Sequence, residues 1–333
     1  MGELSDRRSQ TAERIKDLRT RLTAAEAIAS GKACVYMTGS FGRCEASAHS
    51  DLGLFILGKR DGKPDRNGKQ GSQLSQLDGI CLKADLIEVT REIGIQEFSG
   101  DGRWLVHYSV DDLTQTLGTP EDDVENTFTA RLLLLLESQA LLVEPVYRDV
   151  LDDVIAAYWR DYEDHKTNFM PAFLTNDILR LWRTFCVNYE ARTERTPEPE
   201  KAKGKLKNYK LKHSRLLTCY SAILYLIAVY SQNGSVHPGD ARKMIELTPT
   251  ERLEWLRGQS YISDSHEILD ALLTQYELFL TTTNASEEEL ILRFMDKEKS
   301  KEYLDAAGKF GDLVFDALDG IGKRSGFHRL VVV

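Results

Sequence analysis

The chain has 333 residues and a formal net charge of −9; 42% of its residues are hydrophobic and 29% are charged. This composition is that of a globular protein long enough for two hydrophobic cores, and the acidic balance excludes a chain devoted wholly to coating nucleic acid. The five cysteines have no paired spacing, which argues against a disulfide framework and a zinc site. No apolar run approaches the roughly 18 residues of a membrane span. We therefore expect a cytoplasmic protein without membrane contact.

The first third of the chain alternates short apolar runs with amphipathic stretches, which is typical of a small α/β unit. In chain order the patterns predict an amphipathic helix over 3–30, buried strands over 33–38 and 52–57, a polar loop over 58–71, a helix over 72–93, a strand over about 103–108 and a short helix from Ser109 to Gly118. Residues 86–89 fit a strand as well as the end of a helix, so both interpretations stay open there.

After Thr119-Pro120 long helical patterns replace the strands. They are expected at about 123–142, 146–166, 174–194, 210–232, 238–246, 250–258, 262–281, 286–295 and 299–320. The linker over 193–204 is expected to be mobile, and a strand pattern returns only at 331–333. We predict an α+β fold with three parts, which are an N-terminal helix over 1–30 that packs on the core, a small α/β domain with a mixed sheet over 31–119, and an all-helical domain over 120–333.

The stretch Val35–Leu57 carries the residues that point to chemistry. A Gly39-Ser40 turn at the start of a short helix offers backbone N–H groups, a hydroxyl and the positive end of a helix dipole, and this combination binds phosphate. Arg43 adds positive charge nearby. Asp51, eleven residues after Ser40, begins the next strand and is expected to face the same pocket. A carboxylate there suits a metal ion shared with the phosphates of a nucleotide.

The run Gly39-Ser-Phe-Gly-Arg43, followed by Glu45 and Ser50-Asp-Leu-Gly-Leu-Phe55, resembles the signature of the DNA polymerase β-like nucleotidyltransferase superfamily. Within it the run is most similar to the bacterial branch around the PII-protein uridylyltransferases. The resemblance covers roughly residues 33 to 58. It implies a Gly-Ser turn on the nucleotide phosphates and an Asp-x-Asp pair that, with a third carboxylate from a later strand, holds two magnesium ions.

Gly53 departs from this signature, because it stands where the resemblance implies the second aspartate. Losing one carboxylate is expected to weaken metal binding and to slow phosphoryl transfer. A naturally degenerate enzyme, an inactivating substitution and a rearranged metal site are three explanations that the sequence leaves open. For the third carboxylate Asp101 is the first candidate, with Asp85 and Glu88 as alternatives if residues 84–90 form a strand.

The segment Lys201–Arg215 holds six lysines and one arginine without an acidic residue. It is either a solvated, flexible surface loop or an electropositive arm that meets the nucleotide or a nucleic-acid or protein acceptor. In enzymes that the sequence resembles, lysine and serine on the helical domain hold the triphosphate. By that analogy Lys210, Ser214 and Arg215 are candidates for nucleotide binding.

Asn176, Arg180 and Arg183 recur at spacings of four and three, so they share one face of a predicted helix. This face is expected either to contact the base or an acidic substrate, or to form an internal network with Asp177 and nearby acids. The sequence does not separate the two.

These patterns together predict a nucleotidyltransferase that moves a nucleoside monophosphate from an NTP to a hydroxyl with Mg²⁺ or Mn²⁺. Ser40 and the Gly39 backbone would hold phosphates, Arg43 would support them, and Asp51 and Asp101 would hold metal. The acceptor stays open between a protein, a nucleic-acid end and another nucleotide, as in signalling-oligonucleotide synthases of bacterial defence. The rival hypotheses are a nucleotide-binding regulator that has lost the chemistry, which Gly53 favours, and an RNA-binding module that uses the lysine segment.

Overall fold

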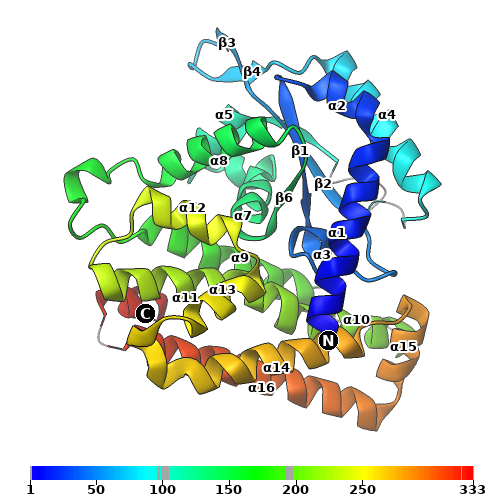
Figure 1. The fold of residues 1–333 in the computed structure, drawn as a ribbon, viewed down its shortest axis with the longest axis vertical. Coiled ribbons are helices and arrows are strands. Elements are labelled where there is room, and N and C mark those ends of the chain that lie inside the picture. The colour runs from blue at the N-terminus through cyan, green and yellow to red at the C-terminus, as the bar shows by residue number, and fades with distance from the viewer. Residues whose placement is uncertain (1, 96–97, 99–104, 192–197, 324, 333) are drawn as a thin grey trace. The chain divides into compact units, whose positions relative to one another are not determined.

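The computed structural model describes residues 2–95, 98, 105–191, 198–323 and 325–332. The fold is α+β, as predicted (Figure 1). Contacts divide the chain into two compact units, essentially Glu3–Arg160 and Asp161–Val333. This division falls some way after the boundary at 119 that the sequence suggested. The physical reason is a strand, β6 (Gln139–Leu142), that pairs with the first strand of the chain and so ties residues 120–142 to the first unit.

The first unit is built on a four-stranded mixed sheet with the strand order β5-β2-β1-β6. The central strand β1 (Ala33–Thr38) runs antiparallel to β2 (Gly53–Gly58) and to β6, whereas β5 (His107–Ser109) runs parallel to β2. Every residue of β1 is buried, because helices cover both faces of the sheet. This double burial explains why its sequence reads as one apolar run instead of an alternating pattern.

Eight helices are described in this unit: α1 (Glu3–Arg21), α2 (Thr23–Ala29), α3 (Gly39–Gly42), α4 (Gln76–Glu92), α5 (Val110–Thr114), α6 (Glu121–Val124), α7 (Thr127–Glu137) and α8 (Glu144–Tyr158). Figure 1 shows α1, α2 and α4 on one face of the sheet and α7 and α8 on the other. Val35, Met37 and Leu54 pack into the core beneath α1, α2 and α4. On the opposite face the ring of Tyr36 stacks on Phe55 at 5.3 Å.

Two predicted helices are each interrupted. The helix expected over 3–30 breaks at Leu22, whose backbone is not helical. The helix expected over 123–142 becomes α6, α7 and then β6; Asn126, with a left-handed φ of 58°, separates α6 from α7. The whole stretch 76–92 is helical, so the alternative of a strand over 86–89 is wrong.

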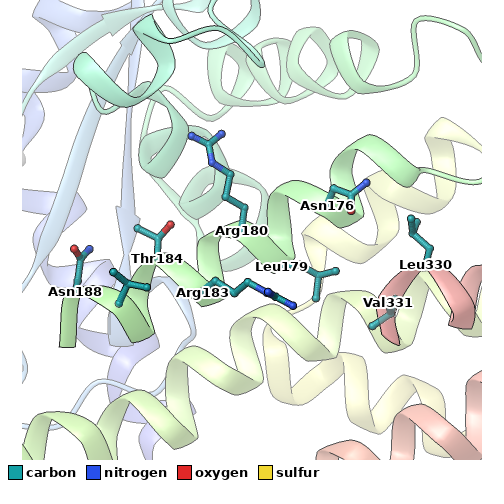
Figure 2. Close-up of a pocket in the computed structure, with 9 residues that line it drawn as sticks. Asn176, Leu179, Arg180, Arg183, Thr184, Asn188, Leu330 and Val331 are labelled. Carbon is teal, nitrogen blue, oxygen red and sulfur yellow. The ribbon is translucent and has the colours of Figure 1, made fainter. Parts of the chain in front are cut away.

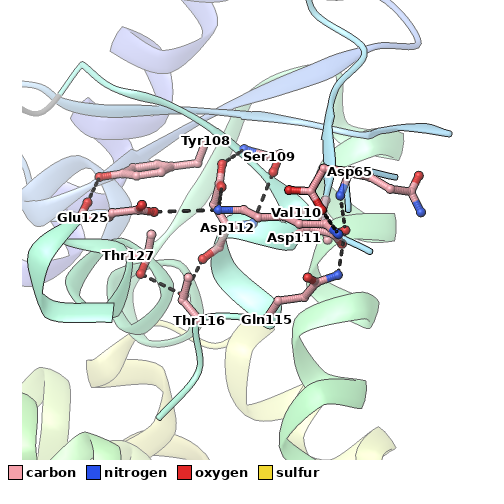
Figure 3. Close-up of polar contacts among 12 residues, drawn as sticks. Asp65, Tyr108, Ser109, Val110, Asp111, Asp112, Gln115, Thr116, Glu125 and Thr127 are labelled. Carbon is pink, nitrogen blue, oxygen red and sulfur yellow. Dashed lines mark hydrogen bonds and ion pairs between the residues drawn. The ribbon is translucent and has the colours of Figure 1, made fainter. Parts of the chain in front are cut away.

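A β-hairpin stands where a loop over 58–71 was expected. Its strands are β3 (Arg60–Pro64) and β4 (Gln70–Ser72). Asp111, almost fully buried at the start of α5, tethers this hairpin (Figure 3). Its carboxylate accepts hydrogen bonds from Arg60 Nε at 2.5 Å and from the Gln70 backbone N–H at 2.8 Å. The predicted capping box, in which Ser109 and Asp112 bond each other's backbone N–H, is confirmed.

Every secondary-structure element that the structure describes in the second unit is a helix. Its helices are η1 (Glu163–His165), α9 (Ala172–Glu190), α10 (Glu198–Lys210), η2 (Leu211–Arg215), α11 (Leu216–Asn233), α12 (Pro238–Glu246), α13 (Pro249–Arg257), η3 (Ser260–Ser265), α14 (His266–Thr282), α15 (Glu287–Met295), α16 (Lys297–Gly322) and α17 (Gly326–Val332). Two expectations are corrected here. Residues 198–204 of the expected linker are helical, and residues 331–332 of the expected strand belong to α17.

Glu200–Asn233 forms one continuous helical stretch through the centre of the second unit. By length and composition it is apolar enough to cross a membrane, but 78% of its most apolar window is buried inside the protein, as in the core helix of a soluble protein. Its middle turn, η2, is a π-helix. There His213 stacks between the rings of Phe279 and Phe310, with centroids 4.6 and 4.9 Å away. This burial lowers the pKa of His213 to about 4.

Candidate site at one edge of the sheet

The predicted phosphate turn and Asp51 meet at the same edge of the sheet. In the antiparallel pair of β1 and β2, Thr38 lies opposite Gly53. The residues that follow β1 and those that precede β2 are therefore neighbours. Gly39 and Ser40 begin α3 directly after β1, and Asp51 lies two residues before β2. Ser40 and Asp51 therefore lie at the same end of the β1–β2 pair.

Gly39 and Gly42 of the turn must each be a glycine, for two different physical reasons. Gly39 has a φ of +70°, in the left-handed region that strains other residues. Gly42 is required by close packing, because a Cβ there would lie 2.0 Å from the carbonyl oxygen of Glu137. The α3 turn is therefore fixed in shape by the end of α7.

Arg43 is directed into the protein and not toward a phosphate at the turn. Its side chain is buried, and Nε donates to Glu45 Oε1 at 2.6 Å while Nη1 donates to Glu137 Oε2 at 2.7 Å. The other oxygen of Glu137 accepts the Gly39 N–H at 3.2 Å. The arginine that was expected to support phosphates instead holds the turn from beneath.

Glu137 is the residue at this edge that the sequence analysis missed. It ends the apolar helix α7, and its side chain is fully buried. Nothing in its own neighbourhood of the sequence sets it apart, because its partners Gly39 and Arg43 are more than ninety residues away. A lone glutamate at the end of a run of leucines was the available signal, since such a residue is buried only when it is paired.

Ser40 and Asp51 are the groups left available for a ligand. The Ser40 side chain is half-buried and the Asp51 side chain is exposed. Among the residues that the structure describes, neither the Ser40 hydroxyl nor the Asp51 carboxylate has a hydrogen-bond or ion-pair partner. Both can therefore accept one without breaking an existing contact.

Gly53 sits in a space that is too small for a larger residue as it stands. A Cβ at Gly53 would lie 2.8 Å from the hydroxyl oxygen of Thr38, its partner across the strands. The Thr38 side chain must therefore rotate before a carboxylate fits at position 53. Because threonine is β-branched, it has few other χ1 rotamers to adopt. The surroundings of position 53 therefore fit a glycine and not the second aspartate that the resemblance implies.

The N-terminal helix α1 clasps the loop between α3 and β2. Arg7, Thr11 and Arg14, at spacings of four and three, bond the backbone of residues 45–47. The guanidinium of Arg14 also lies 4.7 Å from the centroid of the Phe41 ring, and burial lowers the pKa of Arg14. Because the loop leads directly to Asp51, α1 helps to fix the position of that carboxylate.

The third carboxylate is not found among the alternatives that the structure describes. Asp101 lies outside the described residues. Asp85 and Glu88 are on the helix α4 and not on a strand, and Asp85 Oδ2 accepts the Ala25 N–H at the start of α2 at 2.8 Å. Across the described part of the chain no group of three or more His, Cys, Asp or Glu side chains has the arrangement of a metal site. Asp51 alone fits a Mg²⁺ ion that is shared with nucleotide phosphates, because Mg²⁺ often takes one or two carboxylates and substrate oxygens.

The other nucleotide-binding candidates lie in the second unit. Ser214 is buried and its hydroxyl donates to the Lys210 carbonyl at 2.8 Å, one turn back in the helix. The guanidinium of Arg215 lies 5.2 Å from the centroid of the Phe185 ring. The basic segment is helical instead of a loop, and Lys203 pairs with Glu287 at 2.5 Å. Part of its charge is therefore already balanced.

The predicted face of Asn176, Arg180 and Arg183 does line a hollow (Figure 2). This hollow lies between α9 and α17 and has a volume of about 440 Å³. Arg180 pairs with Asp177 at 4.0 Å, which accords with the internal network that was the alternative interpretation.

Comparisons with known proteins gave no match: no protein-family model, no curated protein and no solved structure is significantly similar to this chain. The likeness to the nucleotidyltransferase signature therefore depends on the residues of the motif alone.

Proposed function

We propose that the first unit binds a nucleoside triphosphate with Mg²⁺ and transfers its nucleoside monophosphate to a hydroxyl acceptor. One observation carries the proposal. The Ser40 hydroxyl and the Asp51 carboxylate, neither with a partner among the described residues, lie on the segments that follow β1 and precede β2, each two residues from the paired Thr38 and Gly53. A nucleotide–metal complex needs a group that hydrogen-bonds to its phosphates and a carboxylate that binds its metal ion.

The residues of the turn would take distinct roles. The N–H groups of Ser40 and Phe41 have no acceptor within α3, since the first N–H groups of a helix never do, and they would donate to phosphate oxygens together with the Ser40 hydroxyl. Asp51 would hold Mg²⁺, which supplies positive charge to the phosphates. Glu137 and Arg43 would keep the turn in shape. Lys210, Ser214 and Arg215 stay in the proposal as triphosphate contacts by analogy only.

The acceptor and the base are left open. A protein side chain, a nucleic-acid end or another nucleotide would each supply the attacking hydroxyl, and the helical segment Lys201–Arg215 is the surface proposed for an acidic acceptor. A cytoplasmic location is also part of the proposal. It is supported by the five cysteines, all of which are free thiols.

A second function is favoured by the contact between Gly53 and Thr38. A Cβ at position 53 would lie 2.8 Å from the Thr38 hydroxyl oxygen, so Thr38 would have to move before the second carboxylate of the expected pair could be placed there. A nucleotide-binding regulator that retains the turn and Asp51 but does not turn over would have this arrangement.

Transfer is tested by incubating the full chain with radiolabelled NTPs and Mg²⁺ or Mn²⁺, and by measuring released pyrophosphate. The chain is compared with Gly53→Asp, Gly53→Asp/Thr38→Ala and Asp51→Asn. Pyrophosphate release that Asp51→Asn abolishes supports the transferase. Release only in the variants with Asp at 53 supports the regulator, and release in none of them contradicts the transferase.

A further inference from the structure

The hollow between α9 and α17 has the size and chemistry of a ligand site. Its volume of about 440 Å³ falls within the range of small-molecule pockets. Seven of its lining residues come from α9, and Leu330 and Val331 come from α17. From residue 176 to residue 188 the hollow extends for about 18 Å along α9, since a helix rises 1.5 Å per residue. An elongated ligand would fit this shape.

Among the described residues that line the hollow, the only charged side chains are arginines. The described residues that line the hollow include two arginines, two asparagines and one threonine, but no carboxylate. Arg180 pairs with Asp177, and in Figure 2 it points away from Arg183. Arg183 is exposed, and within the described ranges it has no hydrogen bond or ion pair. Its guanidinium extends along α9 toward the side of Leu330 and Val331 (Figure 2).

The rest of the hollow is apolar. Leu179 and Val187 of α9 face it together with the two residues of α17, and Val187 is 66% exposed. In ligand sites apolar walls provide contact area, and a few polar groups beside them fix the orientation of the ligand.

We propose that this hollow binds an amphiphilic monoanion, with a carboxylate on Arg183 and a medium-length alkyl or acyl chain along Leu179, Leu330 and Val331. A planar carboxylate matches the fork of donors that a guanidinium presents. The elongated apolar wall accounts for the chain. This proposal goes beyond nucleotide binding by the first unit and does not depend on it.

The probe for the test is sodium octanoate; n-octanol carries only its alkyl chain, and sodium acetate carries only its carboxylate. Titrations follow the methyl NMR signals of Leu179, Leu330 and Val331 in the full chain. Octanoate is expected to shift these signals in a saturable way. Each of the two partial probes is expected to bind at least about tenfold more weakly than octanoate.

Arg183→Gln separates the charge from the fold. It is expected to weaken octanoate binding about fivefold or more, because one charge-assisted interaction is lost. Arg257→Gln is the matched control, since Arg257 is an exposed arginine that pairs with Asp270 away from the hollow. Octanoate binding that is unchanged by Arg183→Gln, or equal binding of octanol or acetate, would overturn the proposal, as would the absence of any octanoate-dependent shift.

Discussion

Thr38 and Gly53 face each other across β1 and β2, and a Cβ added to Gly53 would lie 2.8 Å from the Thr38 hydroxyl oxygen. The two residues therefore act as a fitted pair at the edge where Ser40 and Asp51 meet. A carboxylate cannot be restored at position 53 by one substitution without moving its neighbour.

The first prediction follows from this pair. Gly53→Asp is expected to lower the free energy of unfolding by about 1–3 kcal/mol, as overpacking does. In the Thr38→Ala background the same substitution is expected to cost clearly less, because the obstructing hydroxyl is absent. Urea unfolding of the unsubstituted chain, of Gly53→Asp, of Thr38→Ala and of the double variant measures the cost of Gly53→Asp in both backgrounds. An equal cost in the two backgrounds would show that Thr38 is not the obstacle.

The second prediction concerns the buried cluster beneath the turn. Glu137→Gln removes the charge that pairs with Arg43 and is expected to reduce the free energy of unfolding by about 3 kcal/mol, as breaking a buried pair does. Glu144→Gln is the control, because Glu144 pairs with Arg148 on an exposed helix surface, where such pairs contribute about 0.5 kcal/mol or less. Denaturant unfolding compares them, and similar losses in both would contradict the role given to Glu137.

The third prediction is a pH dependence from His213. Burial lowers its folded-state pKa from 6.5 to about 4, so below pH 6.5 the unfolded chain binds a proton that the folded chain does not. The free energy of unfolding has its full value, as far as His213 is concerned, above pH 6.5. It decreases by about 3 kcal/mol in all as the pH falls from 6.5 to 4. His213→Phe is expected to remove this part of the acid dependence. The free energy of unfolding of both chains at pH 7, 5 and 4 tests it, and parallel pH profiles would refute it.

The fourth prediction concerns the hairpin β3–β4. Asp111→Asn weakens the bond to Arg60 and is expected to destabilise the closed hairpin by about 1–3 kcal/mol. Faster hydrogen exchange of the Gln70 N–H, which bonds Asp111, would report the opening. Asp149→Asn serves as control, since Asp149 pairs with Lys59 at the surface. Unchanged exchange in Asp111→Asn would mean that the hairpin is held by other contacts.

Much of the edge of the sheet could be read from the sequence because its signals are local. β1, the turn at Gly39 and β2 are marked by an apolar run, a glycine and a second apolar run within about twenty-five residues. The partners of Arg43 could not be read in the same way. Glu137 is 94 residues from Arg43, and only the folding of α7 against the sheet brings the two together.

The strand β6 was missed for a related reason. Only Glu137, Ser138 and Gln139 separate the leucines at 132–136 from the apolar residues at 140–142. Periodicity cannot distinguish a short buried strand from the last turn of a buried helix in a segment as short as 140–142. The chain changes from α7 to β6 at Ser138, where its backbone becomes extended. The pairing of β6 with β1 is a tertiary contact, so the sequence alone placed residues 139–142 in the wrong element.

The central claim is that Ser40 and Asp51 form one nucleotide site. The most direct measurement is isothermal titration of the full chain with a non-hydrolysable ATP or UTP analogue, with and without Mg²⁺, alongside Ser40→Ala and Asp51→Asn. The account predicts Mg²⁺-dependent binding that each substitution weakens about tenfold or more, with the Mg²⁺ dependence lost in Asp51→Asn. Binding that is absent, or that is the same in all three chains, would contradict it.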